Sequence, residues 1–359
     1  MIARALKVSC LLATTAFAAG LAAASPPAAK TLEIYFLDVE GGQATLIVTP
    51  EHHSLLIDTG WAGDGSGFKP GDPHQARDAN RILAAALDAG ISRIDELLIT
   101  HFHPDHDGGV QELAQLLPVR LFIDHGAPSE GAVRGSAETA AAFKAYEETR
   151  GDSPHLEPRP GDRLPLTDVE ATVVSSAGAT LKRPLPHAGA TNESCGKSAI
   201  PAQDPYENPR STGVVIRFGK FRFLDMGDLS GQPLYALACP KDMVGPVSIY
   251  LVSHHGGGDQ GDLGVFAAFK PRVAVMNNGV RKGGARTTYQ ALPRVGGLQD
   301  VFQLHASAEA AEDNFPDEFI ANLDESTSFW IKVVARADGS FRVQNPRTQE
   351  WFDYPAPSR

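Results

Sequence analysis

Cysteine and long apolar runs are scarce in this sequence, and each shortage narrows the class of protein. Of the three cysteines, Cys10 lies in an apolar N-terminal run, so a chain cleaved after that run keeps only Cys195 and Cys239. In an oxidising compartment these two can pair, but each is equally compatible with a buried thiol, because a sequence alone does not give their geometry. Beyond the N-terminal region no run is long enough to cross a bilayer, so the mature protein is expected to have no membrane segment.

Clusters of positive charge and several catalytic signatures are also missing. The net charge is −11 at pH 7 and the 32 lysines and arginines are scattered, which excludes a strong electrostatic surface for nucleic acid. There is no Gly-x-Ser-x-Gly elbow for a serine nucleophile and no Walker lysine after the glycine runs. The sequence therefore favours a globular protein that acts on a small molecule, and it leaves the oligomeric state open.

The N-terminus has the pattern of a secretory signal. Arg4 and Lys7 precede the apolar run 8–21, and Ala22-Ala23-Ala24 supplies small residues of the kind that signal peptidase cleaves. A permanent membrane anchor is the alternative, but the run is short and is interrupted by Ser, Thr and Gly. We expect residues 1–24 to be a signal peptide, residues 25–31 a linker, and the mature protein to be periplasmic or extracellular.

Apolar periodicity predicts a single α/β domain over 32–345, followed by a C-terminal tail over 346–359. Residues 178–212 are rich in proline and lack periodicity, which indicates an insertion or lid. Helices and strands alternate through much of the domain, as in α/β folds. Strands are expected at 32–37, 44–49, 54–57, 96–100, 119–124, 214–218, 221–224, 247–252, 273–276, 329–335 and 340–343, and helices at 76–89, 109–117, 138–150 and 262–269.

A dense group of metal-binding side chains follows the expected strand 96–100. Residues 101–107 contain three histidines and two aspartates, and Gly108-Gly109 comes directly after them. Imidazole and carboxylate groups are ligands for a borderline divalent ion such as zinc. A tight turn at a strand end can aim several of these groups at one point, so this segment predicts a metal site.

Two further expected strands end in the same way. The strand 221–224 leads to Asp228, and the strand 247–252 leads to His254, His255 and Gly256. Ligands at strand ends along one edge of a fold can converge although they are distant in sequence. Such a set suits a pair of metal ions roughly 3.5–4 Å apart that share a bridging carboxylate.

These segments together resemble the metallo-β-lactamase superfamily. The residues that carry the resemblance are His101-x-His103-x-Asp105-His106, then Asp228, then His254 and His255. More narrowly, the segments 36–43, 55–60 and 253–256 are similar to the hydrolase domain of ComEC-type competence proteins, whose membrane channel is absent here. The resemblance covers most of residues 32–280 and implies an αββα sandwich.

The resemblance also implies ligand roles. His101 and His103 would hold one ion, Asp105 and His106 the other, and Asp228 would bridge them. One of His254 and His255 would complete the second site, because neighbouring residues of a strand point to opposite faces. The expected cofactor is a pair of zinc ions, with manganese or iron as alternatives.

One ligand of the superfamily has no counterpart in this chain. Members commonly have a histidine some two dozen residues before the bridging aspartate, where this chain has the segment 203–208. His187 lies further upstream and is interpreted as an ordinary loop histidine. The first ion is therefore expected to be bound by fewer protein groups.

Residues around these ligands are assigned supporting roles. Asp58 is expected to orient the metal loop, and Asp38 to play a similar part. Weaker candidates for substrate contact follow expected strands or lie in loops. They are Asn208, Asn277 and Asn278, together with Trp61, His74, Arg281 and His305.

The function expected from these residues is metal-dependent hydrolysis. Asp105 would orient or deprotonate the attacking water and Asp228 would hold both ions, with a phosphodiester or small phosphate ester as the favoured substrate. A carbonyl hydrolase acting on a lactone, thioester or β-lactam is the alternative. A non-catalytic binding protein stabilised by metal is a third hypothesis. A di-iron redox centre is disfavoured, because His103 stands where the di-iron relatives in the superfamily tend to carry a carboxylate.

Overall fold

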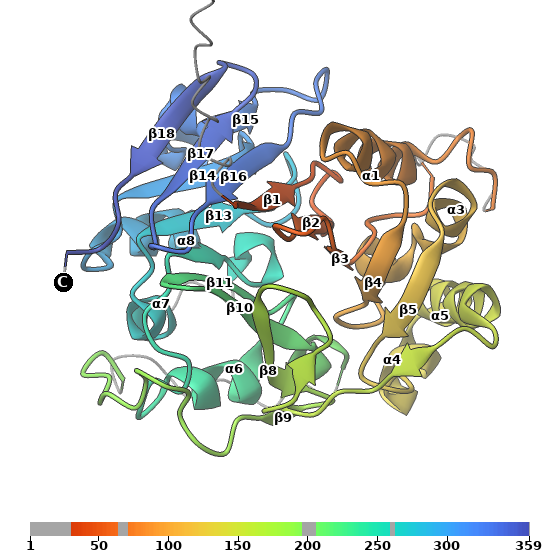
Figure 1. Ribbon diagram of the computed structural model, residues 1–359, viewed down its shortest axis with the longest axis horizontal. Coiled ribbons are helices and arrows are strands. Elements are labelled where there is room, and N and C mark those ends of the chain that lie inside the picture. The colour runs from red at the N-terminus through yellow and green to blue at the C-terminus, as the bar shows by residue number, and fades with distance from the viewer. Residues whose placement is uncertain (1–29, 64–70, 196–205, 259–262, 359) are drawn as a thin grey trace, which may run out of the picture.

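Two mixed β-sheets, with helices on their outer faces, make up the computed structural model (Figure 1). The structure describes residues 30–63, 71–195, 206–258 and 263–358. The expected signal peptide and most of the expected linker lie outside these residues. None of the helices in the described ranges combines the length and the apolar character needed to cross a membrane.

The first sheet has nine strands in the order β18-β17-β16-β1-β2-β3-β4-β5-β6. Strands β1, β2 and β3 form an antiparallel meander, and β3 to β6 run parallel to one another. Their bounds are β1 (Leu32–Phe36), β2 (Thr45–Val48), β3 (Ser54–Ile57), β4 (Ile94–Leu98), β5 (Val119–Ile123), β6 (His155–Leu156), β16 (Ile331–Ala335), β17 (Phe341–Asn345) and β18 (Glu350–Tyr354).

The second sheet has the order β15-β14-β13-β12-β11-β10-β8-β7, with β9 paired to β8. Strands β11 to β15 are parallel and the remaining pairs are antiparallel. The bounds are β7 (Arg163–Leu164), β8 (Glu170–Ser176), β9 (Ala179–Thr180), β10 (Gly213–Phe218), β11 (Phe221–Asp225), β12 (Ile249–Leu251), β13 (Val273–Met276), β14 (Asp300–His305) and β15 (Ile320–Asn322).

The fold has four layers, in the order helices, sheet, sheet, helices, and a hydrophobic cluster lies between each pair of neighbouring layers. Side chains alternate along β1, so that Ile34 and Phe36 pack between the two sheets while Tyr35 faces the outer helices. Ile82 of α1 belongs to the cluster outside the first sheet, and Phe266 of α7 to the one outside the second. The helices are α1 (Arg77–Asp88), α2 (Pro104–Asp107), α3 (Val110–Leu116), α4 (Glu130–Gly135), α5 (Ala137–Arg150), α6 (Gly231–Ala238), α7 (Leu263–Phe269) and α8 (Arg286–Ala291). The αββα sandwich that the resemblance implied is thus confirmed.

The expected tail over 346–359 is wrong, because β18 within it is a strand of the first sheet. It pairs with β17 along its length, and Tyr354 stacks on Phe341 with ring centroids 4.6 Å apart. Phe352 also packs against the cluster between the sheets. Burial of these aromatic side chains fixes the strand, although the run is short and contains two acidic residues.

The first described part of the proline-rich segment 178–212, residues 178–195, is held to the helices outside the second sheet. A disulfide joins Cys195 to Cys239, which follows α6 directly. The Asn192 side chain donates to the Ala238 and Gly264 carbonyls. The middle of the expected insertion, residues 196–205, lies outside the described residues.

Candidate metal centre

The ligand candidates follow strands of both sheets. His101 comes three residues after β4, Asp228 three residues after β11, and His255 in a turn soon after β12. Gly227 permits the close approach of these segments, because its φ is +53° and a Cβ there would lie 2.6 Å from Thr100 Oγ1. The two sheets therefore contribute to one site.

Four buried side chains form the group called here the second metal group: Asp105, His106, Asp228 and His255. Asp105 Oδ2 lies 3.3 Å from His106 Nε2 and 3.2 Å from His255 Nε2. Asp228 approaches the same two nitrogens, each at 3.2 Å. Two carboxylates and two imidazoles thus face one point, which is a donor set suited to zinc.

Three side chains form the first metal group: His101, His103 and Asp228. His101 Nε2 lies 2.9 Å from His103 Nδ1 and 3.9 Å from Asp228 Oδ2. His101 and Asp228 are buried and His103 is partly exposed. Asp228 belongs to both groups, which is the position that a bridging carboxylate requires.

Several of these atoms are buried without a hydrogen-bonding partner among the described residues. They are His106 Nε2, His255 Nε2 and Asp228 Oδ1, and all three point into the second metal group. A buried polar atom without a partner costs free energy, and a bound cation would satisfy all three at once. The residues present therefore fit a metal ion.

The structure distinguishes the two neighbouring histidines near the end of β12. The His255 side chain is 1% exposed and lies in the second metal group. The His254 side chain is 31% exposed, lies 3.8 Å from Asp228 Oδ2, and is in neither group. Both residues have positive φ, so they form a turn rather than an extended strand. His255 is accordingly the better candidate ligand, and His254 lies at the rim.

Asp58 makes the contacts that an orienting role requires. It accepts hydrogen bonds from the Thr100 backbone N–H and hydroxyl, each at 2.7 Å, and its Oδ2 lies 2.7 Å from His106 Nδ1. These contacts turn His106 Nε2 toward the metal group. Asp38 lies in a different cluster with His305, at 2.7 Å, and Arg81, at 3.1 Å.

The protonation of the site follows from burial and from the surrounding charges. Burial lowers the pKa of His101 well below its usual value, so this imidazole is neutral, as a ligand must be. Burial alone would raise the pKa of Asp228, but neighbouring His106 and His255 hold it well below its usual range. Burial would lower the pKa of His106, but Asp228, Asp105 and Asp58 raise it well above its ordinary value. A cation that binds here therefore displaces the His106 proton.

Lys282 is a cation at the site that the sequence analysis missed. Its ammonium group pairs with Asp105 Oδ2, donates to the Gly41 carbonyl at 2.8 Å, and lies 5.7 Å from the centre of the Trp61 ring. Burial would raise the pKa of Asp105, but Lys282 and His106 hold it well below its usual range. The sequence did contain a signal for Lys282, because this residue follows the Asn-Asn-Gly turn after β13. The sequence analysis named its neighbour Arg281 as a candidate for substrate contact instead.

Most of the expected substrate contacts are corrected by the structure. Asn277 and Asn278 are buried and donate within the protein, to Gln43 Oε1 at 3.2 Å and to the His305 carbonyl at 2.8 Å. His305 itself is buried against Asp38. Burial, rather than complete pairing, removes these side chains from the surface, because Asn277 Oδ1, Asn278 Oδ1 and His305 Nδ1 have no hydrogen-bonding partner among the described residues. His74 and Arg281 are exposed and belong to neither metal group. Asn208 remains a candidate, since its Nδ2 lies 3.4 Å from His254 Nε2.

Glu207 lies in the segment 203–208, where the superfamily's additional histidine is missing. It is fully buried, its Oε2 lies 3.0 Å from His125 Nε2, and its Oε1 accepts from the Ser129 N–H at 2.6 Å. Burial would raise the pKa of Glu207, but His125 and the Ser129 N–H hold it below its usual value. The segment thus contributes a buried carboxylate in contact with His125, together with Asn208, rather than a histidine ligand.

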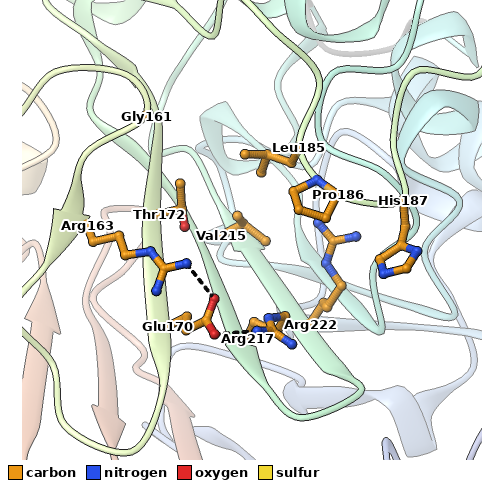
Figure 2. Close-up of a pocket in the computed structure, with 10 residues that line it drawn as sticks. All are labelled: Gly161, Arg163, Glu170, Thr172, Leu185, Pro186, His187, Val215, Arg217 and Arg222. Carbon is orange, nitrogen blue, oxygen red and sulfur yellow. Dashed lines mark hydrogen bonds and ion pairs between the residues drawn. The ribbon is translucent and has the colours of Figure 1, made fainter.

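Two cavities differ in their relation to the metal groups. One, of about 340 Å³, borders His103 and Asn208. The other, of about 420 Å³, lies on the second sheet, and no residue of either metal group lines it. Figure 2 shows that Arg163 and Arg217 at this second cavity both pair with Glu170, which offsets part of their positive charge.

Comparison with known proteins gives one family and one curated relative. The sequence model of the metallo-beta-lactamase superfamily matches residues 37–195. A hydroxyacylglutathione hydrolase from Alkalilimnicola ehrlichii is 34% identical over 84 residues, which cover 20% of this chain and 31% of that protein. The chain therefore matches less than a third of the length of this relative.

Solved structures of the same fold have low sequence identity to this chain. YhfI of Bacillus subtilis, a metallo-beta-lactamase fold protein, is 11% identical with a TM-score of 0.46, covering 76% of this chain and 96% of that chain. A diphosphatase of the PhnP family is 13% identical with a TM-score of 0.39, covering 75% of this chain and 94% of that chain. With TM-scores below 0.5, these likenesses support no further conclusion.

Proposed function

Because the sequence model of the metallo-beta-lactamase superfamily matches residues 37–195, we propose that the two metal groups are the active centre of a metal-dependent hydrolase of this superfamily. The observation that carries this proposal is the position of Asp228, which contacts His106 and His255 of the second group and lies near His101 of the first. A single carboxylate between two sets of neutral and anionic donors suits a pair of zinc ions.

Bound ions would supply a water of lowered pKa and stabilise negative charge as it develops on the substrate. The chain itself supplies the remaining functions. Asp105 and Asp228 are ionised, so they can hold the cations or accept a proton from an attacking water. Asp58 fixes the orientation of His106, and Lys282 places a positive charge beside Asp105.

The substrate that these residues favour is a phosphodiester or a small phosphate ester. Lys282 supports this choice, because an ammonium group next to the metal groups would attract an anionic substrate. A thioester is the second candidate, and it rests on the local similarity to a hydroxyacylglutathione hydrolase. The narrower resemblance to ComEC-type hydrolase domains adds weight to the phosphodiester.

A purely structural metal site is the alternative of another class. Structural zinc sites are normally closed by four protein ligands. Among the described residues, the first metal group has three side chains, and one of them, His103, borders a cavity. An open coordination position next to a cavity is the arrangement of a catalytic site rather than a structural one.

A substrate panel tests the proposed function. Purified protein would be assayed with bis(p-nitrophenyl) phosphate, an S-acyl glutathione thioester, a homoserine lactone and a chromogenic cephalosporin. Each assay would be run as purified, after chelation, and after zinc is restored. We expect turnover of the phosphodiester that is lost on chelation and recovered with zinc. Turnover of none of these, with chelation only unfolding the protein, would favour the structural site.

We also propose that the protein is exported and folds in an oxidising compartment. The disulfide between Cys195 and Cys239 supports this, because such bonds persist mainly outside the cytosol. The signal-like residues 1–24 support it as well. Cell fractionation, together with N-terminal sequencing of the mature chain, tests this proposal.

A further inference from the structure

The cavity beside the first metal group, called here the side cavity, is lined by two walls. One wall comes from α4 and the start of α5, with Gly131, Gly135, Ser136 and Thr139, and the other from Tyr206 and Asn208. His103 lies where the cavity meets the first metal group. A molecule in the cavity would therefore contact a candidate ligand of the first ion.

The chemistry of the side cavity is polar but uncharged. Its lining, as far as the described residues define it, contains no lysine, arginine, aspartate or glutamate. The polar side chains are the hydroxyls of Ser136, Thr139 and Tyr206, the amide of Asn208 and, at the edge next to the first metal group, the imidazole of His103. An isolated charge placed here would lose hydration without gaining an ionic partner, whereas a neutral group could form hydrogen bonds.

The centre has a positive charge beside the second metal group, away from the side cavity. Lys282 pairs with Asp105 of the second metal group, whereas the side cavity borders the first group. The centre is therefore asymmetric, with a cation near one group and an uncharged cavity at the other. A substrate with an anionic reacting group and a neutral substituent matches this asymmetry.

The two walls of the side cavity are fixed to each other by one buried carboxylate. Glu207 accepts from the N–H of Ser129, whose hydroxyl caps α4, and its other oxygen lies 3.0 Å from His125 Nε2. Since Tyr206 and Asn208 flank Glu207, this contact ties the second wall to the first. The cavity is preformed, as small-molecule sites usually are.

Open space remains at the α4 wall. A Cβ added at Gly135 would meet no heavy atom within 4 Å, and Gly135 does not have a positive φ. With about 340 Å³, the cavity is near the lower end of the usual range for ligand sites, about 300–1,000 Å³. This space is large enough for a ring-sized group.

From this placement, we propose that the side cavity binds the neutral, ring-sized substituent of the substrate, an aryl or similar uncharged group with hydrogen-bonding edges. The proposal rests on the proposed function, in that the reacting phosphoryl or carbonyl group would lie at the metal groups. It assigns substrate selectivity to α4 and the Tyr206–Asn208 segment rather than to the metal ligands.

The test compares Gly135→Leu with Gly296→Leu in the zinc-loaded protein. Leucine at Gly135 would occupy part of the side cavity, and its Cβ would meet no heavy atom within 4 Å. Gly296 is a matched control, because it also has no heavy atom within 4 Å of an added Cβ, has no positive φ and lies outside the side cavity. Metal content and melting temperature should match the wild type in both variants.

Two chromogenic diesters supply the first measurement: phenyl p-nitrophenyl phosphate and its 4-carboxyphenyl analogue. We expect the wild type to have at least about tenfold higher kcat/KM for the phenyl compound, a free-energy difference of about 1.4 kcal/mol. Gly135→Leu should lower kcat/KM for the phenyl compound by about tenfold or more, and Gly296→Leu should leave it unchanged. Unchanged turnover in Gly135→Leu, or equal wild-type turnover of the two diesters, would overturn the inference.

A binding measurement separates failure of the inference from failure of the proposed function. If the wild type hydrolyses neither diester, the phosphodiesterase proposal fails. Calorimetric binding of diphenyl phosphate then decides the inference. Binding that is at least about tenfold weaker in Gly135→Leu than in the wild type and in Gly296→Leu supports it. Equal binding by all three proteins, or no binding by any of them, overturns it.

Discussion

The two metal groups share Asp228 but differ in how completely protein side chains would enclose a bound ion. The second group has four side chains, all of them buried. The first group has three, and His103 lies at the edge of the side cavity. An ion in the second group would be enclosed by protein, whereas an ion in the first would keep a position open to substrate. The difference indicates that one group serves mainly to hold an ion and the other to present one.

Asp228→Asn should have the largest effect, because it removes the carboxylate that both groups share. We expect loss of both ions and a fall in turnover on the order of 10³-fold, since metal ions stabilise transition-state charge by several kcal/mol. Metal content by elemental analysis and turnover of the active diester are the measurements. Near-normal activity, with folding verified by circular dichroism, would refute the bridging position.

The variants His255→Ala and His254→Ala distinguish a candidate ligand of the second metal group from a histidine at the rim of the site. His255→Ala removes a ligand of the second group, so metal content should fall from about two ions to about one, and turnover by about 10²-fold. His254→Ala should keep both ions and lose less than about tenfold in turnover. Equal metal loss in the two variants would mean that both histidines are ligands.

Lys282→Met should weaken substrate binding and leave metal binding unchanged. Removing the ammonium group is expected to raise KM for an anionic diester about tenfold, with little change in kcat. Its exposed neighbour offers a matched control, Arg281→Met, which should leave KM unchanged. If KM stays the same and metal content falls, Lys282 supports Asp105 and does not contact substrate.

Glu207→Gln should have the smallest effect on turnover and a clear effect on stability. Breaking the buried pair with His125 is expected to lower the free energy of unfolding by about 3 kcal/mol, measured by urea denaturation. Because the pKa of Glu207 is lowered in the folded protein, its stabilising contribution is present above about pH 4.3 and is lost as the pH falls through the folded value. Exposed Glu309→Gln should change stability by less than about 0.5 kcal/mol. Equal stability of the two variants would contradict the structural role of Glu207.

Elements with strong local patterns were predictable from the sequence. The run 54–57 has the bounds of β3, and the helix expected over 76–89 differs from α1 by one residue at each end. Their apolar spacing and turn residues are local signals. Strand β14 was not expected, because it carries Gln303 and His305, which are buried only through hydrogen bonds to distant segments.

The candidate metal ligands were more predictable than the residues that surround them. Histidines and aspartates next to glycine at strand ends are conspicuous in a sequence. The partner of Asp105 was not, because Lys282 reaches it from a loop 177 positions away. Asn277 and Asn278 were assigned to substrate on their position after a strand, and only the fold shows that both side chains are buried and that their amide nitrogens donate to Gln43 Oε1 and to the His305 carbonyl.

The position of β1 has a consequence for how the chain acquires its structure. This strand is formed by some of the first described residues, yet it lies in the interior of its sheet between β2 and β16, with Leu32 opposite Ala335. One edge of β1 stays without its partner until residues 331–335 of β16 pair with it. Such an edge is a template for pairing with other chains, and contacts between distant segments form slowly. Completion of the first sheet is therefore a late event, and chains truncated before residue 331 would be prone to aggregate.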